Sequence, residues 1–212
     1  MDLFLTWLLV VSIQLAAVMS PGPAFFFTIS NATKYSRRIG IWACLGLALG
    51  VLMHVSLVLT GLSYLVSESI FLFNLIKYVG AAYLFYLGVK VLLSIKKGQN
   101  LDQDILNAEK PKQQITAHKA IFLGFLANAL NPKAVLFFTA FFTQFIDPTT
   151  PFFVKCIYGM ISVCFEFLWF SGVVVFLTNT QIRAKFMSVM HWVDGVCGGL
   201  MIALGVKLAL SK

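Results

Sequence analysis

The sequence predicts an all-α membrane protein of six transmembrane helices, arranged as two inverted three-helix repeats. The first reason is composition: 59% of the 212 residues are hydrophobic and only 11% are charged. A soluble domain carries about 25% charged residues, and the mean hydropathy of this chain is +0.89. An unusually apolar soluble protein is the alternative, but it would lack the polar groups to cover its surface. The other two reasons are the lengths of the apolar runs and the likeness of the two halves of the chain.

Six apolar runs are long enough to cross a bilayer, whose hydrocarbon core of about 30 Å needs about 20 residues of helix. They cover residues 3–30, 39–66, 70–95, 120–146, 152–178 and 189–210. Together they leave no room for a soluble catalytic domain. The one long polar stretch, at 96–119, is expected to be a flexible loop.

The net charge of +8 predicts an orientation in the membrane. Basic residues gather in three alternate connections, which contain Lys34, Arg37 and Arg38; Lys96, Lys97, Lys110, Lys112 and Lys119; and Arg183 and Lys185. The positive-inside rule places these connections in the cytosol and both termini outside it. The expected location is therefore the cytoplasmic (inner) membrane, with the lipid bilayer rather than nucleic acid as the partner.

The two halves of the chain resemble each other. "YLGVKVLLS" ends the third run and "ALGVKLALS" ends the sixth, while Ser20-Pro21 interrupts the first and Asn131-Pro132 the fourth. A duplicated unit of three helices must cross the membrane in the opposite direction, which gives the inverted repeat common among transporters. We therefore expect one transmembrane domain over 1–212, with repeat one at 1–95, a basic cytoplasmic loop at 96–119 and repeat two at 120–212. A chance match of short apolar segments is the alternative.

The prolines predict helix starts inside the membrane, because Ser and Asn are good N-caps and Pro is favoured at the first helical position. Each new N-terminus would present unpaired N–H groups and the positive end of a helix dipole. In inverted halves the two ends can face one centre, which suits an anion such as a carboxylate. Two proline kinks with only a packing role are the alternative.

These residues also carry a resemblance to a known family. The chain resembles the LysE/RhtB family of amino-acid exporters over nearly its whole length, through "SPGP" at 20–23, "GLALG" at 46–50 with His54, "KYVGAAYLFYLGVKVL" at 77–92 and "FLANALNPKAVLFF" at 125–138. The resemblance implies a transporter that exports amino acids or related small zwitterions, driven by the proton gradient. Asp194 and Cys197 stand where the first repeat has Lys77 and Gly80, and this departure leaves the role of the sixth run open.

The expected substrate-binding residues lie at and near the two breaks. They are Ser20, Pro21, Gly22, Pro23, Asn128, Asn131, Pro132 and Lys133. Lys133 follows Pro132 within a long apolar run, where a lysine side chain has difficulty reaching water. We expect it to face the cavity and supply charge for a carboxylate, or to pair with Glu166 or an asparagine.

Three further residues are candidates for proton coupling or for binding a substrate ammonium group. Glu166 lies midway along the fifth run, where a carboxylate usually faces the interior of the bundle; a structural partner for a lysine or hydroxyl is the alternative. His54 shares one helix face with Gly46 and Gly50, a spacing that favours close helix packing, and it is read as a packed core histidine or a proton relay. Asp194 is read as a coupling residue or as an interfacial residue without a specific role.

Other function classes find less support. Cys44, Cys156, Cys164 and Cys197 form no paired motif, His54, His118 and His191 are dispersed, and no phosphate-binding loop is present. The sequence therefore predicts no enzyme, no cofactor and no metal site. A transporter of another small solute or cation, or a membrane subunit without transport activity, remains an alternative, and association into a homo-oligomer is left open.

Overall fold

The computed structural model describes residues 3–20, 22–68, 115–145, 150–178 and 180–210, together with positions 75, 78, 79, 81–83, 85, 86, 88–90, 92 and 93. All described secondary structure is helical. The helices are α1 (Leu3–Met19), α2 (Pro23–Lys34), α3 (Arg37–Glu68), α6 (Ala117–Ala129), α7 (Pro132–Phe145), α8 (Phe152–Leu177) and α9 (Thr180–Leu210).

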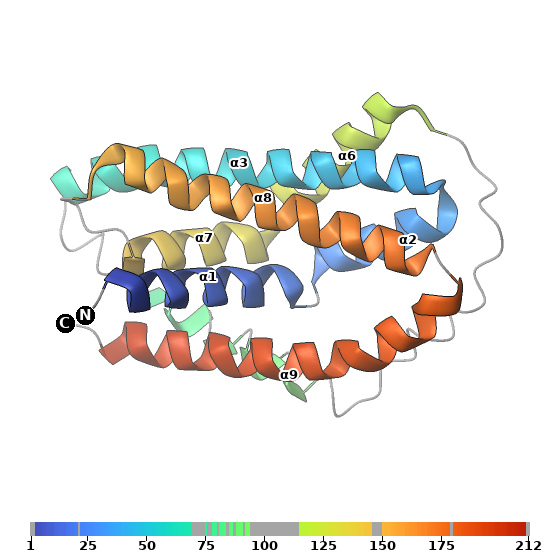
Figure 1. Cartoon of the computed structure of the whole chain (residues 1–212). Helices are drawn as coiled ribbons and strands as arrows, with labels where there is room; N and C mark the ends of the chain where they lie inside the picture. The colour runs from blue at the N-terminus through green and yellow to red at the C-terminus, as the bar shows by residue number, and fades with distance from the viewer. Residues whose placement is uncertain are drawn as a thin grey trace.

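The helices form an elongated bundle in which α1, α3, α7, α8 and α9 run roughly side by side, while α2 and α6 are inclined to them (Figure 1). Within the described residues, α3 and α8 are each long and apolar enough to cross a membrane. The number is four if each of two bent pairs crosses the membrane as one span: α1 with α2, bent by 57°, and α6 with α7, bent by 60°. The third and sixth of the predicted spans stay predictions, although the described positions of both are helical.

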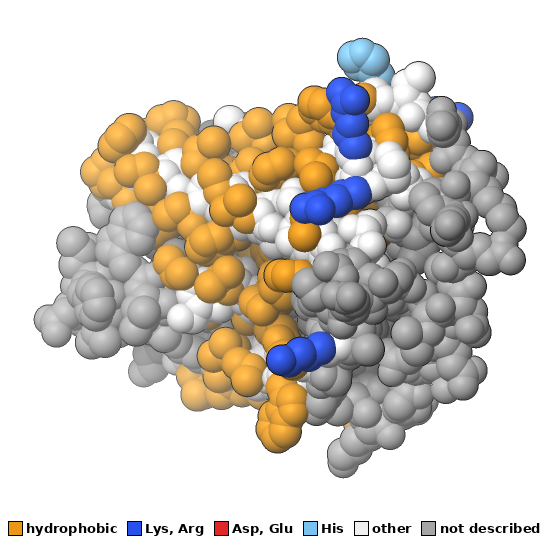
Figure 2. All heavy atoms as spheres, turned by 45° about the vertical axis from the view of Figure 1, so that its right-hand side comes forward, with side chains coloured by type: hydrophobic (Ala, Val, Ile, Leu, Met, Phe, Trp, Pro, Cys, Tyr) orange, Lys and Arg blue, Asp and Glu red, His pale blue; other side chains and the backbone are white. Residues whose placement is uncertain are grey.

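One end of the bundle is basic. The exposed side chains of Arg37, Arg38, Lys119 and Lys185 lie where α3, α6 and α9 begin (Figures 1 and 2). We call this the basic end, and the end where α1 begins and α9 finishes the opposite end. Arg183 and Lys185 belong to the first turns of α9 and not to a loop as predicted, because α9 extends beyond its apolar segment to Thr180.

The two helix breaks differ from each other. The second is as predicted: α7 begins at Pro132, and Asn131 Oδ1 accepts the N–H of Lys133 at 3.0 Å. At the first break the prediction of a helix start at Ser20-Pro21 is wrong, because α2 begins at Pro23 after the extended residue Gly22. The Ser20 hydroxyl turns back and donates to Ala17 O at 3.3 Å. The second proline of the motif therefore provides the helix start.

Glycines set the closest helix contacts. A Cβ on Gly46 of α3 would lie 2.0 Å from Ile121 O, and a Cβ on Gly124 of α6 would lie 2.1 Å from Ala43 O. Gly50 of α3 faces Asn128 of α6 in the same way, at 2.7 Å from its Cβ. The prediction that Gly46 and Gly50 allow close packing is confirmed, and α6 is the partner.

Other glycine contacts occur in pairs with a common sequence offset. A Cβ on Gly40 would meet Val174 at 2.8 Å, and one on Gly159 would meet Val55 at 2.4 Å. Gly40 and Gly159 are as far apart in the sequence as Val55 and Val174. The two contacts between α3 and α8 therefore exchange when the halves of the chain are exchanged.

The same relation holds between the third predicted span and α9. A Cβ on Gly88 would meet Gly198 O and Ile202, both at 2.6 Å, and one on Gly205 would meet Ala81 O at 2.8 Å and Phe85 N at 2.9 Å. Ala81 and Phe85 precede Gly198 and Ile202 by the separation that relates Gly88 to Gly205.

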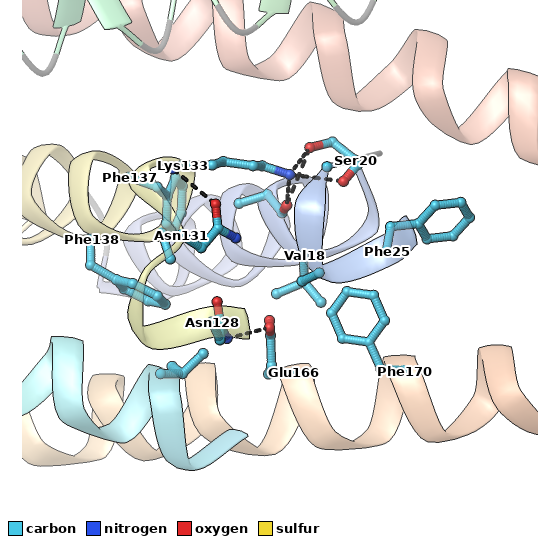
Figure 3. A pocket seen from close by; sticks show the side chains of 15 residues that line it. Val18, Ser20, Phe25, Asn128, Asn131, Lys133, Phe137, Phe138, Glu166 and Phe170 are labelled. Carbon is cyan, nitrogen blue, oxygen red and sulfur yellow. Dashed lines mark hydrogen bonds between the residues drawn. The ribbon is translucent and has the colours of Figure 1, made fainter. Parts of the chain in front are cut away.

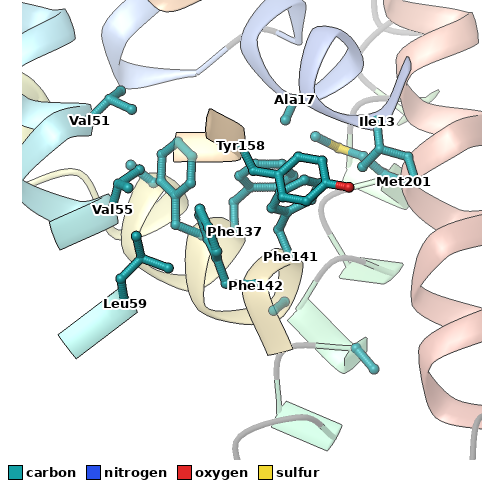
Figure 4. Packing of buried hydrophobic residues seen from close by; sticks show 14 residues of the cluster. Ile13, Ala17, Val51, Val55, Leu59, Phe137, Phe141, Phe142, Tyr158 and Met201 are labelled. Atoms are coloured by element: carbon teal, nitrogen blue, oxygen red, sulfur yellow. The ribbon is translucent and has the colours of Figure 1, made fainter. Parts of the chain in front are cut away.

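A hydrophobic cluster surrounds α7, on the side of the second break that faces the opposite end (Figures 1 and 4). Four phenylalanines of α7, each at most 4% exposed, belong to it: Phe137, Phe138, Phe141 and Phe142. They are two pairs of neighbours separated by one helical turn, so they cover one face of α7. Tyr158 of α8 and Val55 of α3 pack against that face.

The glycine contacts predict that a glycine-to-alanine substitution in α3 lowers stability at Gly46 but not at Gly61. In Gly46→Ala the new methyl group meets the backbone of α6, so we expect the free energy of unfolding to fall by about 2 kcal/mol or more. That loss corresponds to a melting temperature about 5 °C lower in detergent. Gly61→Ala on the same helix is the control, because no atom lies within 4 Å of its added Cβ. Equal melting temperatures for the two variants would contradict the packing described.

Candidate functional site

The two helix breaks meet at a cavity near the middle of the bundle (Figure 3). Its polar lining comes from Ser20, Asn128, Asn131, Lys133 and Glu166, and its apolar lining includes Val18, Phe25, Val51, Phe137, Phe138 and Phe170. The volume is about 40 Å³, which is room for about three water molecules. The cavity is thus a small, mostly apolar space with a few charged and amide groups.

Asn128 links three helices beside the cavity. Its side-chain Nδ2 donates to Glu166 Oε1 of α8 and to Leu47 O of α3, both at 2.8 Å. Its backbone oxygen lies 2.9 Å from His54 Nε2, and because a carbonyl only accepts, Nε2 is the donating nitrogen. Buried polar groups need hydrogen-bond partners, and Asn128 supplies one to the Glu166 carboxylate. Leu47 lies inside α3, so its carbonyl accepts the Asn128 amide in addition to its own helical hydrogen bond.

Glu166 is the buried carboxylate predicted from the sequence, and only 6% of the residue is exposed. Oε1 is held by Asn128, and Figure 3 shows the carboxylate facing the cavity from below. A buried charge of this kind needs partners of opposite charge or strong donors. Lys133 lines the same cavity and supplies the opposite charge.

Lys133 reaches across from α7 to the end of α1. Its Nζ donates to Ala17 O at 3.0 Å, to Ser20 O at 2.8 Å and to the Ser20 hydroxyl oxygen. An ammonium group has three N–H donors, and these three acceptors match that number. Lys133 therefore contributes positive charge to the cavity while its hydrogen bonds go to the backbone and side chain at the first break.

The two helix starts offer different groups to a ligand. At α7 the side chain of Asn131 caps Lys133 N–H, and the N–H of Ala134 is bonded to Asn131 O at 3.0 Å. At α2 Gly22 provides no side-chain cap, and the N–H groups of Ala24 and Phe25 precede the first backbone hydrogen bond, Phe26 N–H to Gly22 O at 3.1 Å. The start of α2 is thus the more open of the two to an anion.

The structure brings together only part of the predicted set. Ser20, Gly22, Asn128, Asn131, Lys133 and Glu166 line the cavity. Pro23 and Pro132 begin helices and are exposed, and His54 contacts the cavity residue Asn128 from behind. Pro21 and the side chain of Asp194 lie outside the described residues. Binding and coupling roles for all of these residues stay predictions.

Sequence reasoning missed the aromatic lining. Phe25, Phe137, Phe138 and Phe170 line the cavity, yet the chain has 21 phenylalanines and nothing in their spacing distinguishes these four. A signal was present for Phe25, which follows Pro23, and for Phe137 and Phe138, which follow Pro132, but not for Phe170.

The role of Asn128 in this network is testable. In Asn128→Ala the buried Glu166 carboxylate loses a donor, which costs about 1–3 kcal/mol, whereas Leu47 O keeps its helical hydrogen bond within α3. We expect a melting temperature about 3–10 °C lower. Glu166→Gln is the matched variant, since its amide oxygen still accepts from Asn128, and we expect a smaller change. Equal losses in the two variants would argue against Asn128 as the centre of the network.

Comparison with known proteins identifies the family of this chain. Residues 15–212 match the LysE type translocator family. A threonine efflux protein of Escherichia coli K12 is 28% identical over 99% of this chain and 98% of its own length, and one of Salmonella typhimurium is 29% identical over the full length of both. An uncharacterized membrane protein of Bacillus subtilis is 31% identical over 94% of this chain and 97% of its own. No solved structure matches. The chain belongs to the LysE type translocator family.

Proposed function

We propose that this protein exports small neutral amino acids, such as threonine, across the cytoplasmic membrane in exchange for protons. The observation that carries the proposal is the meeting of two broken helices at one cavity that holds a carboxylate, an ammonium group and two asparagine amides. Discontinuous helices around a central cavity are a general construction of secondary transporters. The relatives named as threonine efflux proteins support the substrate class.

The charges of the cavity suit a zwitterion. A substrate carboxylate would lie at the start of α2, near the N–H groups of Ala24 and Phe25 and within the field of Lys133. The substrate ammonium would lie toward Glu166 and Asn128. A neutral side chain would then meet apolar residues such as Val18 and Phe138.

The proposed mechanism is alternating access within an inverted repeat. The paired contacts of Gly40 with Gly159 and of Gly88 with Gly205 support the repeat, because they exchange when the two halves are exchanged. The cavity is smaller than an amino acid, so binding requires one end to open. Phe25 and Phe170 close it toward the basic end, and Phe137 and Phe138 close it toward the opposite end (Figure 3). By the positive-inside rule the basic end faces the cytosol and both termini lie outside it.

Transport is tested with proteoliposomes loaded with a panel of labelled amino acids. We expect efflux of threonine and similar small neutral amino acids above that of empty-membrane controls, and a marked loss of this difference when a protonophore collapses the proton gradient. Amino-acid amides and N-acetyl amino acids should compete poorly, because each lacks one of the two charges. Equal efflux of all members of the panel, with and without protein, would reject the proposal.

The proton role is assigned to Glu166 and has its own test. With protons entering as substrate leaves, acidifying the outside should speed efflux by the wild type. Glu166→Gln cannot exchange the proton, so its efflux should be insensitive to external pH. Cys164→Ala, an exposed position on the same helix, is the control and should keep the wild-type profile. An unchanged pH profile in Glu166→Gln would reject the proton role and leave ammonium binding as the function of this carboxylate.

A further inference from the structure

We infer that Lys133 is a tethered cation, and that its ammonium group occupies a monovalent-cation site built by the end of α1. The site consists of Ala17 O, Ser20 O and the Ser20 hydroxyl oxygen. A transporter of this type would carry its own cation at the first break and would need no dissolved metal ion there.

The site exists because α1 ends inside the bundle. The last carbonyl groups of a helix have no partner within it, and they carry the negative end of the helix dipole. Ala16 O is bonded to Ser20 N–H at 3.0 Å, but the residue four positions after Ala17 is Pro21, which has no N–H to donate. The Ala17 carbonyl instead accepts from the Ser20 hydroxyl at 3.3 Å and from Lys133 Nζ at 3.0 Å. Ala17 and Ser20 are 6% and 2% exposed, so bulk water does not satisfy their carbonyls. Carbonyls at the ends of broken membrane helices are typical ligands of monovalent cations.

The position of Lys133 on its own helix also supports a cation site at the end of α1. It is the second residue of α7, close to the positive end of that helix dipole, where a positive charge is unfavourable. The interactions at the end of α1 must therefore outweigh this repulsion. Gly22 leaves room for the lysine stem, because a Cβ there would lie 3.1 Å from Lys133 Cδ.

The second break has a comparable solution with a different donor. Asn128 stands at the same distance before Asn131-Pro132 as Ala17 stands before Ser20-Pro21. Its carbonyl receives His54 Nε2 at 2.9 Å, whereas that of Ala17 receives Lys133 Nζ. In both broken helices a side-chain nitrogen from another helix binds this carbonyl, which also accepts the Ser20 hydroxyl at the first break and Asn131 N–H at the second. Only the first gathers three oxygens around one ammonium group.

The experiment removes the lysine side chain with Lys133→Ala and then adds a free ammonium ion of the same size. The atoms lost in Lys133→Ala are those of n-propylammonium, so this ion should enter the vacated space and bind the same oxygens. We expect the purified variant to melt on the order of 5 °C below the wild type, since hydrogen bonds to a charged group are lost. n-Propylammonium chloride should restore most of the difference. Tetramethylammonium chloride, which has the same charge but no N–H donor, should restore none.

The controls separate a specific site from a general salt effect. Wild type and Lys119→Ala, an exposed lysine at the start of α6, should not respond to either ion. Equal effects of the two ions on Lys133→Ala, or a variant as stable as the wild type, would overturn the inference. The measurement contains no amino acid, so its outcome does not depend on the proposed transport function.

A second comparison decides the case in which Lys133→Ala yields no folded protein. Lys133→Met keeps an unbranched stem without charge, and Lys133→Arg keeps the charge and donors. A greater yield of folded, monodisperse protein for the arginine variant than for the methionine variant supports the cation site. A methionine variant that folds as well as the arginine variant overturns it.

Discussion

A helix that ends inside a membrane leaves backbone carbonyl and N–H groups that lipid cannot satisfy, and this constraint organises the centre of the molecule. Two bent helix pairs are broken at the centre of the bundle, so two sets of such groups must find partners within the protein. Asn131 caps the start of α7, Lys133 binds the end of α1, and His54 meets the end of α6. The start of α2 has the least complete set of partners, and it borders the cavity. The side chains that bind the backbone groups at the two breaks therefore also form the polar lining of the cavity or lie next to it.

The glycine contacts explain how these partners come within reach. His54 of α3 can reach Asn128 of α6 only because Gly46, Gly50 and Gly124 let the two backbones approach closely. The same approach places Leu47 O and Glu166 Oε1 within hydrogen-bond distance of the Asn128 amide. Close packing at these small residues thus brings the polar side chains within hydrogen-bond distance of one another. The apolar packing and the candidate site depend on each other.

The cavity contains one lysine and one glutamate, and their arrangement is asymmetric. Lys133 is bound to oxygens of the first break, whereas Glu166 is bound to an asparagine next to the second break. A zwitterionic ligand placed between them would meet opposite fields at its two ends. Phenylalanines from α7 cover one side of this space, and Phe25 and Phe170 cover the other. Motion of the broken helices would move Phe25, Phe137 and Phe138 together with the polar groups at the two breaks.

Much of the architecture follows from the sequence alone, because it depends on local properties. Apolar length defines membrane helices, proline and asparagine define the start of α7, and the spacing of Gly46 and Gly50 defines a packing face. The choice of partners depended on the tertiary structure, because a sequence does not state which helices touch. For example, the sequence predicted a helix start at Ser20-Pro21, but α2 begins at Pro23. The Ser20 hydroxyl does not cap α2, because it donates to Ala17 O of α1 and accepts from Lys133 Nζ. The place of Phe170 beside the cavity and the contact of Lys133 with Ala17 and Ser20 arise only when distant segments pack against each other.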